Sequence, residues 1–205
     1  MARPAGARNH DFDEKRTKLL DTLTNHALDA DLRRPSLRQF AIAAGASEPT
    51  LRHYFGDRQG VVVAILENIG RRGTPIWNMI AEPAETPTEA LEQYFRIAET
   101  GMRHANFTRA HAFGLIEGIA EEKAGKAYLR HILEPALKSI MDKLGNTPNG
   151  PTSENALRAA AMAAMAPLLV MSIHQDLLGG DTEAPIDSQS MIRNIQAWLG
   201  AGITT

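Results

Sequence analysis

The stretch SLRQFAIAAGASEPTLRHYFGDRQGV, which begins at Ser36, constrains the fold more than any other part of the sequence. Ser36 and Gln39 have the spacing of a capping box, in which each side chain satisfies a free backbone N–H at a helix start. Gly45 offers a left-handed turn position at low cost, because glycine has no Cβ. Ser47 can cap a second helix, and Pro49 suits its first turn, where a backbone N–H has no intrahelical partner. The stretch predicts two short helices joined by a tight turn.

Each of these two helices has one apolar face. Leu37, Phe40 and Ala41 recur three and four residues apart in the first helix, and Leu51 and Phe55 form an i, i+4 pair in the second. The pattern is that of a helix-turn-helix, whose second helix enters the DNA major groove. Two amphipathic helices can also meet at a glycine for purely structural reasons, so the motif alone leaves both interpretations open.

The residues from Ala44 to Arg58, AGASEPTLRHYFGDR, resemble the recognition region of the TetR family of transcriptional repressors. The family pattern runs Gly, small or Val, Ser, any, Gly or Pro, Thr, Leu or Ile, Tyr, any, His or Tyr, Phe, then a short turn and Lys. Most positions match. Arg52 stands where the family usually has Tyr and Arg58 where it usually has Lys; both usual residues contact phosphate, and arginine also donates to phosphate. The resemblance covers the first third of the chain and implies a homodimer that binds double-stranded operator DNA.

The charge distribution agrees with a DNA-binding first part. Residues 1–73 hold 12 Lys and Arg against 9 Asp and Glu, whereas residues 74–205 hold 10 against 15. A surface that binds phosphate needs this positive excess. The side chains expected to contact DNA lie on the polar face or ends of the second helix, with two further phosphate contacts from the first helix and the turn: Thr50, Arg52, His53, Tyr54 and Arg58, then Arg38 and Ser47.

Apolar periodicity predicts an all-α protein of about nine helices. Residues 1–10 are expected to form a disordered arm whose Arg3 and Arg8 either reach DNA or have no role. The expected parts after the arm are a helix-turn-helix domain over residues 11–56, a connecting helix over 57–73, and a ligand-binding and dimerisation domain over 74–205. The expected helices cover 12–30, the two of the motif, 57–72, 87–104, 107–120, 122–145, 153–178 and 187–200, and the three prolines in 73–87 predict a linker or broken helix there.

The segment from Ala159 to Leu178 is apolar nearly all round, so its helix must be covered on more than one side. It is either the central core helix of one chain or a helix shared with a second copy. The TetR resemblance implies the second arrangement, with the last two long helices forming a dimer. The expected interface residues are small or apolar: Ala159, Ala163, Ala166, Met191, Ile195 and Trp198.

Several large side chains in the second domain could line a cavity, with Gly114 and Gly118 leaving space beside them. Such residues at helical spacing also serve as plain core, whereas an interior histidine needs a polar partner. We expect a small, largely apolar effector to bind among Trp77, Tyr94, Phe107, His111, Met165 and His174.

The sequence contains no cysteine, which excludes disulfides, thiol catalysis and thiolate metal sites. No cofactor or metal is predicted. No basic-then-apolar signal segment opens the sequence, and the apolar run from Ala159 to Ile173 is shorter than about 20 residues and contains Pro167. We therefore expect a cytoplasmic protein with no membrane partner.

Two other classes of function compete with a DNA-binding regulator. One is an all-α enzyme that uses histidines and carboxylates of the second domain, although the sequence has no Glu-x-x-His, His-Glu-x-x-His or Gly-x-Ser-x-Gly motif and no phosphate-binding glycine loop. The other is a helical protein-interaction module whose helix-turn-helix is only structural. The operator, the effector and the choice between repression and activation are not specified by the residues.

Overall fold

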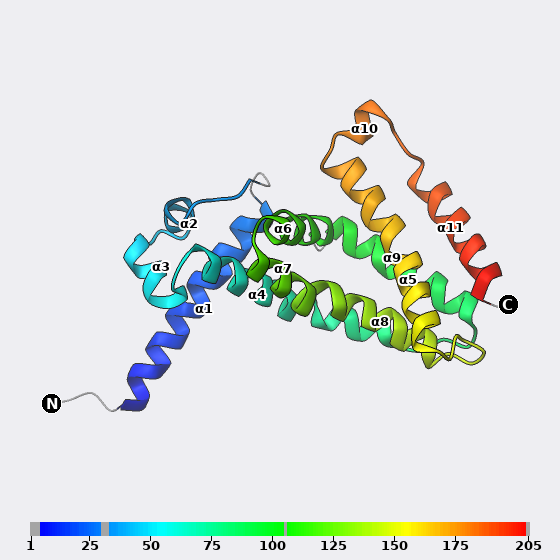
Figure 1. The fold of residues 1–205 in the computed structure, drawn as a ribbon, viewed down its shortest axis with the longest axis horizontal. Coiled ribbons are helices and arrows are strands. Elements are labelled where there is room, and N and C mark those ends of the chain that lie inside the picture. The colour runs from blue at the N-terminus through cyan, green and yellow to red at the C-terminus, as the bar shows by residue number, and fades with distance from the viewer. Residues whose placement is uncertain (1–4, 30–32, 105, 204–205) are drawn as a thin grey trace. The chain divides into compact units, whose positions relative to one another are not determined.

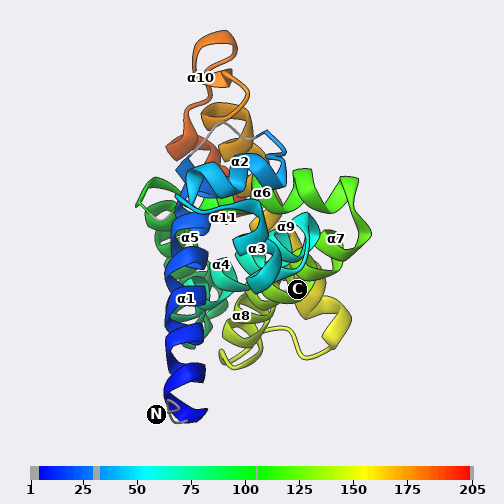
Figure 2. The same cartoon turned by 90° about the vertical axis from the view of Figure 1, so that its left-hand side faces the viewer.

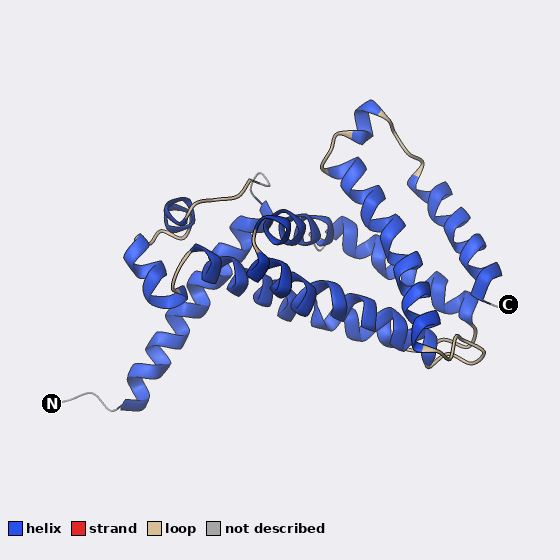
Figure 3. Ribbon diagram, in the orientation of Figure 1, coloured by secondary structure: helices blue, strands red, loops and turns tan. Residues whose placement is uncertain are grey.

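A computed structural model of the chain describes residues 5–29, 33–104 and 106–203. All regular elements in these ranges are helices (Figure 3), and the predicted all-α class is confirmed. In chain order the helices are α1 Ala5–Asp29, α2 Leu37–Ala43, α3 Glu48–Phe55, α4 Arg58–Ala81, α5 Pro87–His104, α6 Phe107–Ala120, α7 Glu122–Tyr128, the π-helix η1 Leu129–Leu133, α8 Glu134–Gly145, α9 Glu154–Asp176, α10 Gly180–Glu183 and α11 Ser188–Ile203 (Figure 1).

The chain divides into two compact units. Unit 1 comprises Met1–Arg72 and Phe113–His131, and unit 2 comprises Gly73–Ala112 and Ile132–Thr205. Unit 1 thus holds the predicted helix-turn-helix together with most of α6 and α7. The sequence alone predicts instead that all of α6 and α7 belong to the second domain.

The helices α1, α2, α3 and α4 each contribute buried side chains to the core of unit 1. Leu23, Phe40, Leu51 and Ile65 have no exposed surface, and burying a side chain of this size stabilises the fold by about 1.5–3 kcal/mol.

A polar seam joins α1 to α4 inside this core. The buried Asn68 amide donates to Thr24 Oγ1 at 2.9 Å and to Asp21 Oδ1 at 3.1 Å. Arg72 also donates to Asp21, at 2.7 Å, and this hydrogen bond lowers the pKa of the Asp21 carboxyl. Because the bonds need matched partners on both helices, the seam fixes the register of α1 against α4.

Two helices extend further than the sequence predicts. α1 begins at Ala5, so residues 5–10 are helical rather than part of a disordered arm; residues 1–4 of that predicted arm lie outside the described residues. α4 continues through Pro75 to Ala81, where the prolines predict a linker or break. A proline inside a helix costs about 3 kcal/mol. The burial of Ile80, with Ile76 packed beside it in the core of unit 2, offsets this cost.

The predicted helix 122–145 is interrupted by the π-helix η1. The π turn ends just before Pro135, which has no N–H to donate to the carbonyl of His131. That carbonyl faces Gly70 of α4 so closely that a Cβ at Gly70 would overlap it. The close approach of α4 to η1 therefore requires glycine at position 70.

A second close contact joins α6 to α7. A Cβ on Gly114 would overlap the ring of Tyr128, and a Cβ on Gly118 would meet Gly125 Cα at 3.0 Å. From the sequence, these two glycines are expected to leave space beside a ligand. The space is instead filled by α7, so both glycines serve helix packing.

The core of unit 2 is formed mainly by α5, α8, α9 and α11. α9 and α11 are joined through α10 and form a helical hairpin (Figure 1). Among the described residues, α9 is the one helix long and apolar enough to cross a membrane by length and composition. Its side chains Ala161, Ala164, Met165 and Leu168 are buried, so this face of α9 packs in the core of unit 2.

Candidate DNA-binding interface

The helix-turn-helix forms with the caps that the sequence predicts. The Gln39 backbone N–H donates to Ser36 Oγ at 3.2 Å, and the Ser36 N–H donates to Gln39 Oε1 at 2.8 Å, which completes the capping box. Gly45 lies in the turn with φ of 60°. Ser47 caps α3 by accepting from the Thr50 N–H at 3.2 Å. The local sequence therefore fixes both the start of α2 and the start of α3.

α3 buries one side and presents the other. Leu51 is fully buried, while Arg52 and His53 are exposed and Thr50 and Tyr54 are half-buried. The Ser47 and Thr50 hydroxyls lie 2.8 Å apart at the start of the helix. Arg38 is exposed on α2.

An aromatic cluster supports the outer side of α3. The ring of Phe12, from α1, lies 4.7 Å from that of Tyr54 and 5.4 Å from that of His53. Arg16, one turn further along α1, places its guanidinium 5.4 Å from the centre of the Phe55 ring. Figure 2 shows α1 along its length with α2 and α3 beside it. The apolar period of the sequence assigns Phe12 only to a packing face and does not single out Arg16.

Arg58 differs from its predicted role. Its Nε donates to the Pro35 carbonyl at 2.7 Å, and its Nη1 and Nη2 donate to the two oxygens of Glu117 at 3.0 and 2.5 Å. The side chain is turned into unit 1 and held by a bidentate pair. In this structure a buried carboxylate, that of Glu117, binds the Arg58 guanidinium, which the sequence had predicted to contact DNA phosphate.

Glu117 is the centre of this charged cluster. Only 1% of its side chain is exposed, and Arg34 also approaches it, with Nε 3.3 Å from Oε2. Glu121, the N-cap residue of α7, accepts from Arg34 at 3.2 Å and from Gln59 at 2.6 Å. The cluster ties the segment before α2 and the start of α4 to the end of α6. No sequence pattern pointed to it, because its partners are 59 or more residues apart.

In unit 2, the six predicted ligand-binding residues fall into separate surroundings. Tyr94 and Met165 are buried in the core cluster, and Trp77 packs against it. The ring of Phe107 lies 4.3 Å from that of the buried His111, whose pKa burial lowers to about 4. His174 Nδ1 lies 2.7 Å from Gln175 Nε2 near the end of α9.

Two cavities of unit 2 are lined by residues other than the six predicted to bind a ligand. One has a volume of about 470 Å³ between α5, α9 and α11, and its polar lining includes Glu99, Ser172 and Asp176. A smaller one of about 200 Å³ lies between α5 and α11, beside Arg96 and Arg193. Within the described residues, no group of three or more His, Asp and Glu side chains could hold a metal ion.

The residues predicted to form the dimer interface differ in their exposure. Ala159, Ala163 and Ala166 are exposed along one face of α9, as is Trp198 of α11, with 71% of its surface accessible. Met191 is half-buried against the core of unit 2. Ile195, which the sequence had predicted to lie at a subunit interface, is 5% exposed and belongs to the core of unit 2.

Several solved structures resemble this chain. A TetR-family transcriptional regulator from Mesorhizobium loti MAFF303099 aligns with a TM-score of 0.65 and 16% identity, over 93% of this chain and 95% of that one. The fatty acid degradation regulator FadR from Bacillus halodurans aligns with a TM-score of 0.59 and 16% identity, over 90% and 94%. The TetR family repressor AlkX from Dietzia sp. strain DQ12-45-1b aligns with a TM-score of 0.51 and 20% identity, over 92% and 94%.

No protein-family model and no curated protein matches the sequence. At the identities found, the structural likeness establishes the fold. The chain has the all-α fold of the transcription regulators that carry an N-terminal helix-turn-helix. That fold is shared with solved TetR-family structures, and the resemblance noted in the sequence is confirmed at the level of fold. The structures that it resembles are regulators, so the fold gives the enzyme alternative no support.

Proposed function

We propose that this protein is a cytoplasmic transcriptional repressor of the TetR type that binds a palindromic operator as a homodimer and is released by a small effector. The observation that carries the proposal is the geometry of α2 and α3. Both helices are capped, Leu51 anchors α3 in the core, and Arg52 and His53 project from its exposed side. A recognition helix needs this combination of a rigid base and an exposed polar face.

Six of the seven predicted contact residues fit this surface. Arg52, His53 and Thr50 can read base edges or bind phosphate, and Tyr54 is held by Phe12 beside them. Arg58 is reassigned to a positioning role, because its guanidinium is bound by Glu117. The remaining contacts are expected from the turn and from α2: Ser47 and Arg38.

DNA binding is tested by selecting duplexes from a random pool and measuring how the affinity for the enriched duplexes depends on salt concentration. We expect an inverted repeat with half-sites about 34–36 Å apart, or a multiple of that repeat. Arg52→Ala should weaken binding by about 1–3 kcal/mol if Arg52 reads a base. Arg130→Ala, on the exposed part of η1, is the matched control. Failure to enrich any sequence, together with binding insensitive to salt, would leave the helical interaction module as the better interpretation.

The exposed apolar face of α9 supports the homodimer. Its three exposed alanines would allow another helix to approach closely, while Met162 and Val170 expose 45% and 65% of their surfaces beside them. An exposed apolar strip of this kind marks an interaction site in soluble proteins. A second copy of the chain related by two-fold symmetry is the simplest partner for this face, since a palindromic operator requires two recognition helices.

We propose that the effector is a small, largely apolar compound bound in unit 2. Two structures that resemble this chain are named for the degradation of fatty acids and of n-alkanes, which are largely apolar compounds. The core around the buried Tyr94 and Met165, and separately the contact between the tilted rings of Phe107 and His111, provide apolar surroundings with a few polar atoms.

Linkage gives a two-sided test of this effector. A compound that weakens operator binding must itself bind more weakly, by the same factor, when operator is saturating. Typical coupling is about 1–3 kcal/mol, which corresponds to roughly 5- to 150-fold. If a screen of fatty acids and related aliphatic compounds yields binders whose affinity ignores the operator, effector control is refuted while DNA binding stands.

A further inference from the structure

An open groove runs between α1 and the helix-turn-helix within unit 1. Its volume is about 570 Å³. Lys15, Lys18 and Thr22 line it from α1, and Ser47 and Thr50 line it from the turn and the start of α3, together with Tyr54. The sequence pattern does not single out either lysine, because it identifies α1 only as a packing helix.

The chemistry of the groove is that of a phosphate-binding strip. Lys15 and Lys18 are exposed and stand three residues apart, so their Cβ atoms lie about 5–6 Å from each other on one face of the helix. No carboxylate is among the residues that line the groove, whereas four hydroxyl groups are. Ammonium groups and hydroxyls are the side-chain groups that hold nucleic-acid backbones in register.

Lys18 already has one anionic partner, which does not block this role. Its Nζ lies 2.7 Å from Glu14 one turn earlier on α1, and this contact raises the pKa of Lys18 and lowers that of Glu14. Both side chains are largely exposed, at 75% and 51%. Exposed pairs of this kind contribute little to stability, so a phosphate can replace or share the carboxylate at small cost.

We infer that this groove seats one strand of the DNA backbone, with Lys15 and Lys18 each contacting a phosphate outside the tract covered by the recognition helix. The inference rests on the proposed DNA-binding function and extends it from α2 and α3 to α1. The groove is continuous with that surface, because Ser47 and Thr50 belong to both. A strand that passes the start of α3 would therefore run on along α1.

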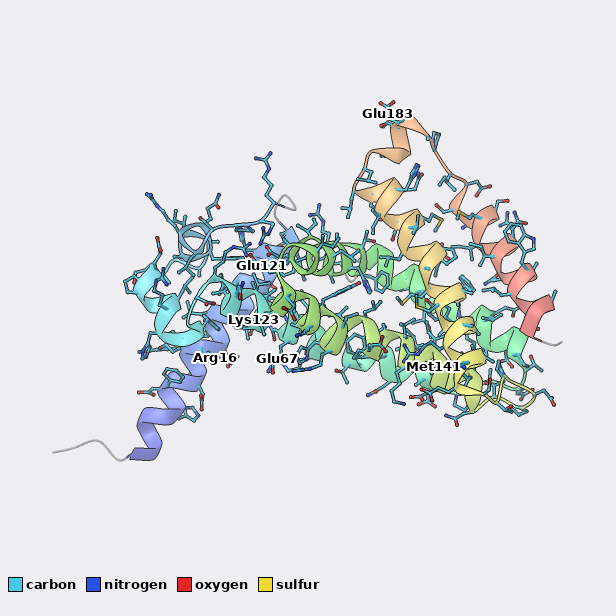
Figure 4. All side chains as sticks on the ribbon, viewed as in Figure 1. Arg16, Glu67, Glu121, Lys123, Met141 and Glu183 are labelled. Atoms are coloured by element: carbon cyan, nitrogen blue, oxygen red, sulfur yellow. The ribbon has the colours of Figure 1, made fainter. Side chains whose placement is uncertain are left out.

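The test compares two double variants that remove the same charge from unit 1. Lys15→Gln/Lys18→Gln empties the groove of positive charge. Lys123→Gln/Lys126→Gln is the control on α7, where Lys126 pairs with Glu122 one turn away as Lys18 does with Glu14 (Figure 4 labels Lys123). Affinity for a synthetic mixed-sequence duplex is measured over a range of salt concentrations. Two lost phosphate contacts should reduce the slope of log K against log salt by about 1.8 in the groove variant only.

Ethylation interference on a selected operator gives a second readout. Phosphates whose modification blocks the wild-type protein should include a pair that no longer matters to the groove variant. Equal slope changes in both double variants would mean a general charge effect and would overturn the inference. An unchanged slope in the groove variant, with Arg52→Ala still weakening binding, would overturn it while leaving the proposed function intact. A wild-type protein that binds no duplex would overturn both the inference about the groove and the proposed DNA-binding function.

Discussion

Arg58 and Glu117, which are 59 residues apart in the chain, form a two-point ion pair whose carboxylate is almost fully buried. The pair joins the first residue of α4, next to the recognition helix, to the last turns of α6. A buried carboxylate is costly unless its charge is neutralised and its oxygens accept hydrogen bonds. Arg58 and Arg34 together meet both needs for Glu117, and this explains why Arg58 does not point outward.

Removing the carboxylate should destabilise the protein. Glu117→Gln leaves Arg58 without its charged partner, and breaking a buried pair in this way typically costs about 3–5 kcal/mol. Urea unfolding measures the loss, with Glu122→Gln on exposed α7 as the control expected to stay within about 0.5 kcal/mol of wild type. Arg58→Gln should lower stability but leave the salt slope of DNA binding unchanged. A slope reduced by about 0.9 with stability intact would instead make Arg58 a phosphate ligand.

Phe12→Ala should weaken DNA binding more than it weakens the fold. The half-buried ring supports Tyr54 and His53, and aromatic pairs of this kind contribute about 0.5–1.5 kcal/mol each. Loss of that support should reduce operator affinity by roughly 2- to 10-fold. Phe107→Ala removes a half-buried phenylalanine from unit 2 and serves as the control in the absence of effector. Equal operator affinities of Phe12→Ala and wild type would show that Phe12 of α1 does not position the recognition helix α3.

Glycine should be required at position 114 and dispensable at position 101. Gly114→Ala forces a methyl group into the ring of Tyr128, and overpacking a tight helix contact costs about 1–3 kcal/mol. Gly101 lies in α5, and a Cβ at this position would have no neighbour within 4 Å, so Gly101→Ala should stabilise the helix by about 0.5–1 kcal/mol. Melting temperatures of both variants check the opposite signs. A Gly114→Ala protein as stable as wild type would mean that α6 and α7 do not pack this closely.

Acid should destabilise the protein through His111. Burial holds the pKa of His111 at about 4, below the value of about 6.5 in an unfolded chain. Between these values the unfolded chain binds a proton that the folded chain does not, so the free energy of unfolding falls as pH decreases from about 6.5 to about 4. The full effect is about 3 kcal/mol. His111→Gln should remove this pH dependence and His53→Gln, at an exposed site, should keep it; identical pH profiles for all three proteins would contradict the assignment.

A charge on the outer face of α9 should separate the subunits. Ala163→Glu places a carboxylate where a second helix is proposed to pack, and a desolvated unpaired charge cannot be held there. Sedimentation should show monomers or aggregates, whereas Ala120→Glu, at an exposed site on α6, should remain dimeric. A stable Ala163→Glu dimer would move the interface away from this face.

The sequence by itself determined the local structure of the helix-turn-helix and the all-α class. Ser36, Gln39, Gly45 and Ser47 act within a few residues of their partners, so their spacing was enough to place both caps and the turn. The long apolar helix and its start at Ser153 were equally local in origin. Caps and helical periods depend on residues a few positions apart in the chain, and these can be read directly from the sequence.

Only the tertiary structure decided what distant side chains do. The partner of Arg58 lies on α6, the support of Tyr54 comes from α1, and the space beside Gly114 is taken by α7. α4 likewise continues past Pro75 because the later residue Ile80 is buried, and Ile195 is buried in the core of its own chain. These outcomes depend on which helices pack together, and packing free energies between distant segments outweigh local preferences of a few kcal/mol.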